Sequence, residues 1–154
     1  GGDALVAAKW LKLWGCEPTV FLSHEQEKLK LVTKDQLAVW KAFGGAVHDC
    51  TDVPVHHYKG VIDGLLGYSL KGNPRGHAAE LIQWANDSGQ PILALDIPSG
   101  LDATTGEVRD PCIRAAHTCV YGVMKTGLLE DSAKPHVGEI ELIDIGFPRE
   151  LPTT

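Results

Sequence analysis

The sequence predicts an α/β fold in which a mostly parallel sheet is covered by helices on both faces. Short apolar stretches rich in β-branched residues alternate along the chain with amphipathic stretches of helical period. The apolar stretches are continuous, which is typical of parallel strands buried on both faces. With 154 residues and a hydrophobic content of 44%, we expect a single domain, residues 1–154, with a substantial core.

The first half of the chain predicts two helices and two short strands. A helix runs through ALVAAKWLKLWG, where Gly15 ends it, and PTVFL at 18–22 follows as a strand. Residues 25–43 predict a second helix, ended by Gly44-Gly45, and a short strand is expected near Val47. The candidate apolar residues of the first helix are Leu5, Val6, Trp10, Leu11 and Leu13, and those of the second are Leu29, Val32, Leu37, Val39, Trp40 and Phe43.

The second half predicts four strands around one helix. GVIDGLLG at 60–67 is a strand that ends in the glycine-rich loop GYSLKGNPRG, and a helix follows at 77–86. PILALDI at 91–97, HTCVYGV at 117–123 and EIELIDIG at 139–146 are the remaining strands. The sequence contains no internal repeat and no linker, which favours one domain.

A glycine pair stands directly ahead of the first predicted helix. Gly1-Gly2 followed by a helix is typical of a strand-to-helix turn. We therefore expect a strand to precede Gly1, so that the sequence is an N-terminally truncated fragment of the domain.

Composition excludes several classes of protein. A formal net charge of −6 argues against a general nucleic-acid-binding protein, which would carry a basic face. The apolar runs are too short to cross a bilayer, so no membrane association is expected. The cysteines lie at scattered spacings without a C-x-x-C motif, which predicts reduced thiols and a reducing compartment: the cytoplasm, or an organelle such as a mitochondrion or plastid. They are Cys16, Cys50, Cys112 and Cys119.

Three loops are the candidate ligand-binding segments. In parallel α/β sheets, ligands bind outside the carboxyl ends of the strands, which selects residues 1–3, 63–73 and 96–102. Each combines small residues with an acid, although each taken alone also fits a tight turn with a capping side chain. Asp96 interrupts an apolar run, and a buried carboxylate requires a partner, a ligand or a proton. Asp102 fits a turn or helix cap better than a catalytic role.

Familiar catalytic and nucleotide signatures are absent from the sequence. It contains no G-x-G-x-x-G after a strand and no P-loop motif, which disfavours a hydride-transferring dehydrogenase and a P-loop hydrolase. No histidine or cysteine set has zinc spacing, and His56-His57 would point to opposite faces of a strand. Ser99 lacks the G-x-S-x-G context of a nucleophilic serine.

Five segments resemble the YjeF N-terminal domain family of NAD(P)HX epimerases. They are GGDALVAAKWL, VIDGLLGYSLKGN, ALDIPSGLDATTGEV, MKTGLLE and GEIELIDIGFP. Their order and spacing agree over nearly the whole chain, and D-I-P-S-G-L-D-A-x-T-G is the most specific of them. The resemblance implies a Rossmann-like three-layer α/β/α sandwich and the epimerisation of the R and S forms of the hydrated cofactors NADHX and NADPHX. It also implies a bound potassium ion, a functional link to an NAD(P)HX dehydratase and a homodimer.

The resemblance assigns roles to particular positions. Asp63 and Ser99 match the potassium ligands, and Asp96 matches the acid that contacts the substrate. The positions that match the substrate-binding loops are Gly1, Gly2, Asp3, Gly67, Tyr68, Ser69, Leu70, Lys71, Gly72 and Asn73. Two departures bear on the activity of the fragment: the family's loop begins N-N-G-G-D-G, and one of the asparagines absent ahead of Gly1 is a potassium ligand there. Ala4 also stands where glycine is common.

The chemistry of these residues agrees with the resemblance. A carboxylate and a hydroxyl are suitable ligands for a hard monovalent cation, which would let phosphates approach acidic loops. Epimerisation at a carbon that bears a hydroxyl and a nitrogen requires a proton transfer, for which Asp96 is the catalytic candidate. Lys125 is a second candidate, for binding the substrate phosphate or polarising the substrate, with a solvated surface position as its alternative. A non-catalytic YjeF-type nucleotide-binding or scaffold module remains the alternative function.

Overall fold

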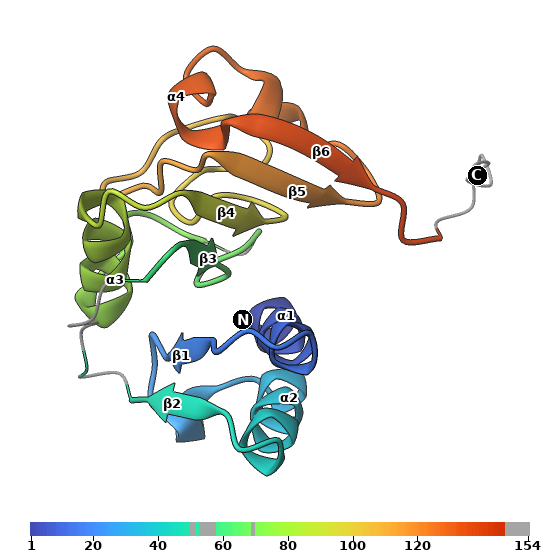
Figure 1. Ribbon diagram of the computed structural model, residues 1–154. Coiled ribbons are helices and arrows are strands. Elements are labelled where there is room, and N and C mark those ends of the chain that lie inside the picture. Colours follow the sequence, from blue (N-terminus) through green and yellow to red (C-terminus); the bar gives the residue numbers. More distant parts are fainter. Residues whose placement is uncertain (50–51, 53–57, 69, 147–154) are drawn as a thin grey trace.

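All strands that the structure describes pair in parallel, as the sequence predicts. The computed structural model describes residues 1–49, 52, 58–68 and 70–146 (Figure 1). Strand β1 (Thr19–Phe21) pairs with β2 (Ala46–His48) in a two-stranded sheet. A four-stranded sheet has the order β3 (Val61–Asp63), β4 (Ile92–Leu95), β5 (His117–Tyr121) and β6 (Glu139–Ile143). Strand β4 is therefore central, and Asp96 follows it directly at its carboxyl end, as expected.

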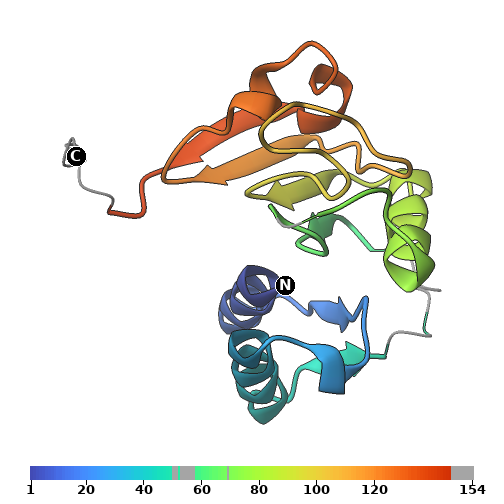
Figure 2. The same cartoon turned by 180° about the vertical axis from the view of Figure 1, so that it is seen from behind.

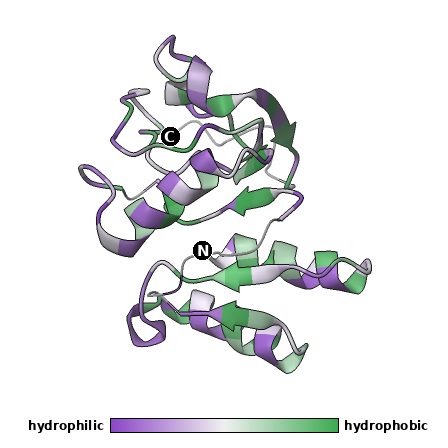
Figure 3. Cartoon of the chain, turned by 60° about the vertical axis from the view of Figure 1, so that its left-hand side comes forward, coloured by the Kyte–Doolittle hydropathy of each residue, from purple (hydrophilic) through white to green (hydrophobic). Residues whose placement is uncertain are grey.

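The helices connect these strands in the predicted order. The three longest are α1 (Gly2–Leu13), α2 (Leu31–Ala42) and α3 (Gly76–Asp87). The short helices η2 (Thr126–Leu129) and α4 (Lys134–Val137) were not predicted, because one turn of helix is too short to show a hydrophobic period. Figure 3 shows hydrophobic strands beside helices that alternate between hydrophobic and hydrophilic residues, the pattern from which these elements were predicted.

The prediction of one continuous helix at 25–43 is wrong. A 3₁₀ turn, η1 (Gln26–Lys28), is separated from α2 by Leu29 and Lys30, whose ψ angles of 146° and 152° are extended. The extended break lets Leu29 pack against the core under α2. Of the predicted apolar residues of α2, Leu37 and Trp40 are buried, whereas Val32 is 69% exposed.

The two sheets are joined by packing instead of by a hydrogen-bonded ladder. Among the described residues, β1 and β3 do not pair, although the sequence predicted a single sheet. Helix α1 spans the junction, since a Cβ placed on Gly64, just after β3, would lie 2.8 Å from the Cβ of Ala4. The absence of a side chain at Gly64 thus allows the start of α1 to lie against the end of β3.

One face of the four-stranded sheet, the core face, is closely covered. Val61, Ile92 and Ala94 pack on this face against Ile82 and other residues of α3. Val120 packs against the segment after β4 together with η2 and α4. Seen from behind, the long connection between β4 and β5 crosses the sheet (Figure 2). Asp63 lies on this face, in register with Ala94.

The opposite face, the α1 face, is less covered. Side chains alternate along a strand, so Leu95, Cys119 and Tyr121 point to this side, and all of them are half-buried. A Cβ placed on Gly64 would lie 3.6 Å from Leu95 Cδ1 and 2.8 Å from the Cβ of Ala4. The start of α1 therefore lies over the same face as Leu95. Helices therefore approach the sheet from both sides, with α1 at the carboxyl ends of the strands.

Several sequence expectations concern the thiols and the membrane. Cys16, Cys112 and Cys119 are free thiols, as predicted, and burial raises the pKa of Cys112 to about 12. Within the described part of the chain, no helix has both the length and the apolar character needed to span a bilayer. Cys50, His56, His57 and Ser69 lie outside the described residues.

A second core holds α1 and α2 together and depends on Trp40. Its side chain is fully buried with Leu5, Leu22 and Leu37, and its ring nitrogen donates a hydrogen bond to Ala46 O at 3.1 Å. The ring packs on the backbone of Gly45, where an added Cβ would lie only 1.9 Å from it. Any side chain at position 45 would therefore displace the ring.

We expect Gly45→Ala to destabilise the protein by about 1–3 kcal/mol, because overpacking forces the buried ring of Trp40 to move. Urea unfolding followed by tryptophan fluorescence measures the change. Gly67→Ala is the matched control, since nothing lies within 4 Å of its built Cβ. Equal stability of the two variants would contradict this account of Trp40.

Candidate functional site

The carboxyl ends of β3, β4 and β5 bring together the acids that the sequence singled out. Asp63 is the last residue of β3, Asp96 follows β4, and Tyr121 is the last residue of β5. Because the strands are parallel neighbours, their ends lie at one edge of the sheet. The loops after β3 and β4 and the start of α1 meet there.

Asp63 and Ser99 form a buried hydrogen-bonded cluster. The hydroxyl of Ser99 donates to Asp63 Oδ1 at 2.6 Å, and the amide of Ser99 donates to Asp63 Oδ2 at 2.7 Å. The amide of Leu66 donates to Ser99 Oγ at 2.9 Å, and the Leu66 carbonyl oxygen lies 3.2 Å from the same hydroxyl. The loops that follow β3 and β4 are thereby joined through one serine.

The turn at Ser99 depends on the glycine after it. Gly100 has a φ of +101°, and a Cβ there would lie 2.6 Å from the Pro111 carbonyl oxygen. The amides of Arg109 and Ile113 donate to the carbonyls of Gly100 and Ser99 at 2.8 and 2.9 Å. A glycine is therefore required where the chain passes closest to the 109–113 segment.

Burial dominates the electrostatics of Asp63. Desolvation raises the pKa of its carboxyl, and hydrogen bonds from Ser99 and Leu65 only partly oppose that effect. No lysine or arginine of the described residues forms an ion pair with it. Asp63, the Ser99 hydroxyl and the Leu66 carbonyl offer only oxygen atoms, which are the ligands that hard cations prefer. These residues fit a potassium ion.

Asp96 has a partner inside the protein. Lys125 Nζ lies 2.5 Å from Asp96 Oδ1, and the amide of Tyr121 donates to the same oxygen at 2.9 Å. Lys125 Nζ also donates to the Tyr121 carbonyl at 2.9 Å and is only 19% exposed, so it is not a solvated surface lysine. Within the described ranges, no donor bonds the second oxygen, Oδ2. A 30% exposed carboxylate thus keeps one oxygen available to a ligand.

The backbone of Asp96 is held in an unusual conformation. Its φ of +69° is the left-handed region, and it is the one residue other than glycine with a positive φ among those described. A side chain in this region costs about 1–2 kcal/mol. Such strain is found where the surrounding structure fixes a functional side chain, which agrees with the pairing of Asp96 to Lys125.

The Gly1-Gly2-Asp3 segment lies at the same edge of the sheet. Ala4, the residue after this segment, lies against Gly64, the residue after Asp63, since a Cβ on Gly64 would be 2.8 Å from the Ala4 Cβ. The negative charge of Asp3 also raises the pKa of the Tyr121 phenol, and the amide of Tyr121 bonds Asp96. The structure therefore brings residues 1–3 to both Asp63 and Asp96.

The second predicted loop lies alongside the 99–110 segment. Tyr68 is 72% exposed, and its hydroxyl lies 3.2 Å from Thr104 Oγ1. The amide of Asp110 donates to Asn73 Oδ1 at 3.4 Å. Leu70 is half-buried, whereas Gly67, Lys71 and Gly72 are exposed, and Ser69 is not among the described residues.

Asp102 closes a turn, as the sequence predicts. Its Oδ1 accepts hydrogen bonds from the amides of Thr104 and Thr105, both at 2.9 Å. These bonds lower the pKa of the carboxyl. Asp102 therefore stabilises the loop and is not part of the cluster around Asp96.

Sequence reasoning missed Tyr121. The residue stands within an apolar strand, HTCVYGV, and nothing local distinguishes it from a core position. Only the register between β4 and β5 places it beside Asp96. Burial, followed by the charges of Asp3, Cys119 and Asp96, raises the pKa of its phenol to about 12.

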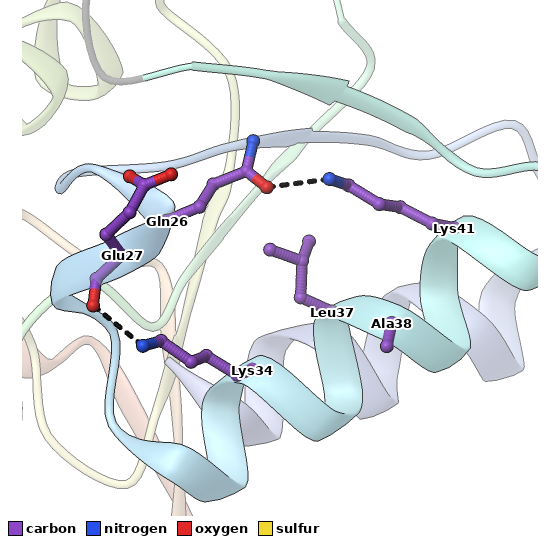
Figure 4. Close-up of a pocket in the computed structure, with 6 residues that line it drawn as sticks. All are labelled: Gln26, Glu27, Lys34, Leu37, Ala38 and Lys41. Carbon is purple, nitrogen blue, oxygen red and sulfur yellow. Dashed lines mark hydrogen bonds between the residues drawn. The ribbon is translucent and has the colours of Figure 1, made fainter.

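A hollow elsewhere on the surface does not contribute to this site. It has a volume of about 360 Å³ and lies between η1 and α2 (Figure 4). Lys34 Nζ donates to the Glu27 carbonyl at 2.7 Å, and Lys41 Nζ donates to Gln26 Oε1 at 2.6 Å. Its polar groups thus bond one another, and none of the site carboxylates lines it.

Comparison with known proteins identifies similar sequences. The family model described as YjeF-related protein N-terminus matches residues 1–127. The chain is 36% identical, over 96% of its length, to an NAD(P)H-hydrate epimerase of Dehalogenimonas lykanthroporepellens, of which it covers 58%. It is 35% identical, over 96% of its length, to a bifunctional NAD(P)H-hydrate repair enzyme of Leishmania braziliensis, of which it covers 27%. The chain therefore spans under a third of that bifunctional relative.

A solved structure supports the fold. The chain is similar to the crystal structure of yeast ynu0, YNL200c, with a TM-score of 0.73 over 92% of this chain and 60% of that one. The sequence identity is 22%, so the likeness concerns the fold alone. The predicted Rossmann-like α/β class is confirmed.

We expect the ionisation of Asp63 to destabilise the potassium-free protein. Its pKa is raised in the folded state, so the native protein binds more protons above the ordinary carboxyl pKa, and stability falls as pH rises through the raised pKa. Asp63→Asn does not titrate. The free energy of unfolding of the wild-type protein, measured relative to this variant, should therefore fall as the pH rises above the ordinary carboxyl pKa of about 4.

Urea unfolding at several pH values in potassium-free buffer measures this difference. Asp35→Asn, which changes an exposed carboxylate of α2, is the matched control. If the difference in the free energy of unfolding between the wild type and Asp63→Asn stays constant with pH, the raised pKa does not belong to Asp63.

Proposed function

Because this chain belongs to the family described as YjeF-related protein N-terminus, we propose that the protein is an NAD(P)H-hydrate epimerase. It would interconvert the R and S forms of NADHX and NADPHX. The observation that carries the proposal is the Asp96–Lys125 pair, which lies where the neighbouring strands β4 and β5 end. The relatives' names indicate the substrates.

The reaction requires a proton to leave the hydroxyl on the hydrated ring carbon. Asp96 Oδ2 has no donor within the described residues, and it accepts this proton as the carbon–oxygen double bond forms. The bond from that carbon to the ring nitrogen breaks, and its electron pair moves to the nitrogen. Rotation about the adjoining carbon–carbon bond then presents the other face of the carbonyl.

Lys125 completes the proton balance. Its ammonium donates a proton to the ring nitrogen as the ring opens, and takes it back as the ring closes on the other carbonyl face. Asp96 returns its proton to the oxygen in the same step, so both residues end in their starting states. The ion pair of Lys125 with Asp96 Oδ1 holds the two groups side by side, so that each can exchange a proton with the substrate.

Potassium is the ion we propose for the Asp63 cluster. Asp63, Ser99 and the Leu66 carbonyl would hold it, and the bound ion would supply positive charge that offsets the acids near a substrate pyrophosphate. Gly1, Gly2, Asp3 and the 67–73 loop would bind the substrate around it.

The wider context is proposed on the same basis. The chain matches only 27% and 31% of the length of two relatives named bifunctional NAD(P)H-hydrate repair enzymes. A second activity in those longer proteins supports a functional link to an NAD(P)HX dehydratase. We also propose a homodimer, because apolar side chains such as Trp10 and Trp14 at the end of α1 are 48% and 72% exposed.

We expect Asp96→Asn to slow epimerisation by on the order of 10²–10⁴-fold, because an amide cannot accept the hydroxyl proton. The R form of NADHX is mixed with the protein and an excess of S-specific dehydratase, and the recovery of NADH is followed. Asp102→Asn is the matched control, since Asp102 only closes a turn, and it should retain the wild-type rate.

Two outcomes would refute parts of this proposal. A wild-type rate equal to spontaneous epimerisation would favour a non-catalytic binding or scaffold module. A wild-type rate retained by Asp96→Asn would keep the activity but remove Asp96 from the chemistry.

We expect potassium chloride to raise the melting temperature of the wild-type protein above its value in choline chloride of equal ionic strength. A ligand that binds only the folded state stabilises it. Asp63→Asn should abolish the difference, because it removes the carboxylate from the proposed ligand set. An unchanged melting temperature in wild type, measured by calorimetry, would argue against the ion.

A further inference from the structure

The backbone of Tyr121 holds the Asp96–Lys125 pair in place. Its amide donates to Asp96 Oδ1 at 2.9 Å, and its carbonyl accepts from Lys125 Nζ at 2.9 Å. The amide of Asp96 in turn donates to the Cys119 carbonyl at 2.8 Å. These bonds fix the backbone of Tyr121 relative to Asp96 and Lys125. The side chain of Tyr121 is therefore attached at a fixed position at the edge of the site.

The side chain of Tyr121 leaves the strand toward the α1 face. Thr118 and Val120 are buried on the core face, so alternation along β5 directs Cys119 and Tyr121 to the opposite side. The start of α1 lies over that side, and the phenol is close enough to Asp3 and Asp96 to respond to their charges. The half-buried ring of Tyr121 therefore lies on the face of the sheet that the start of α1 covers.

The surroundings of the phenol select the kind of group that can bind there. A tyrosine hydroxyl is protonated at neutral pH and can donate a hydrogen bond, and burial raises the pKa of Tyr121 further, to about 12. The negative charges of Asp3 and Asp96 act on the phenol, and they would repel a phosphate there but tolerate an uncharged or cationic ring. A carbonyl or hydroxyl oxygen on such a ring is the acceptor that suits the phenol.

We propose that the Tyr121 phenol contacts the nicotinamide-derived ring of the bound nucleotide and donates a hydrogen bond to an oxygen on it. The contact rests on the proposed function and orients the substrate: the ring lies between Asp3, Asp96 and Tyr121, and the phosphates lie away from these acids. Tyr121 is thus a specificity-determining residue for the ring half of the ligand, in addition to Asp96 and Lys125.

The test compares two ligands that differ only in the ring. NAD⁺ carries nicotinamide with its carboxamide oxygen, and ADP-ribose lacks it. We expect Tyr121→Phe to weaken NAD⁺ binding by roughly 2–12-fold, the loss of one hydrogen bond, and to leave ADP-ribose binding unchanged. Isothermal titration calorimetry on the protein measures both affinities.

Tyr58→Phe is the matched control. Tyr58 makes edge-to-face ring contacts with Phe21 and Trp84 and precedes the amino end of β3, whereas the site lies at the carboxyl end, so loss of its hydroxyl should change neither affinity. The inference is overturned if Tyr121→Phe binds NAD⁺ as tightly as the wild type does. It is also overturned if the variant loses the same affinity for NAD⁺ and for ADP-ribose. Neither result would alter the epimerisation rate of the wild-type protein, on which the proposed function is judged separately.

Discussion

Asp63 places a carboxylate where water does not reach, and the loops of the candidate site are arranged around that charge. Ser99 donates both its amide and its hydroxyl to the acid, and Ser99 Oγ accepts the Leu66 amide. The Ile113 amide donates to the Ser99 carbonyl. A missing partner would leave a buried polar group unsatisfied, at a cost of about 1–3 kcal/mol. One buried acid therefore fixes the loops after β3 and β4 relative to each other.

Asp96 shows the opposite balance, in which the fold accepts strain to position a side chain. Glycine would adopt a φ of +69° without steric cost, but it would provide no carboxylate. The hydrogen bonds from Lys125 and the Tyr121 amide direct Oδ1 into the protein and leave Oδ2 accessible. The cluster at Asp63 is thus held together by hydrogen bonds within the protein, whereas the neighbouring carboxylate of Asp96 keeps one oxygen without a donor among the described residues.

Local patterns predicted the elements that are long or strongly apolar. The parallel strands, helices α1 and α3 and the position of Asp96 at the end of the central strand all follow from hydrophobic period and glycine stops. The break at Leu29 and Lys30 was not predictable, because no proline or glycine marks it, and packing of Leu29 into the core overrides helix propensity there. The single-turn helices η2 and α4 were missed for lack of length.

The sequence by itself determined the order of strands and helices and the acids at the strand ends, because both depend on local patterns of neighbouring residues. Which side chains meet was decided only by the tertiary structure. Asp63 and Ser99 are 36 residues apart, and Asp96 and Lys125 are 29 apart. No local period encodes such pairs, which depend on the register of adjacent parallel strands and on the loops packed between them. Tyr121 resembles a core residue in the sequence for the same reason, and the pairing of β4 with β5 places it beside Asp96.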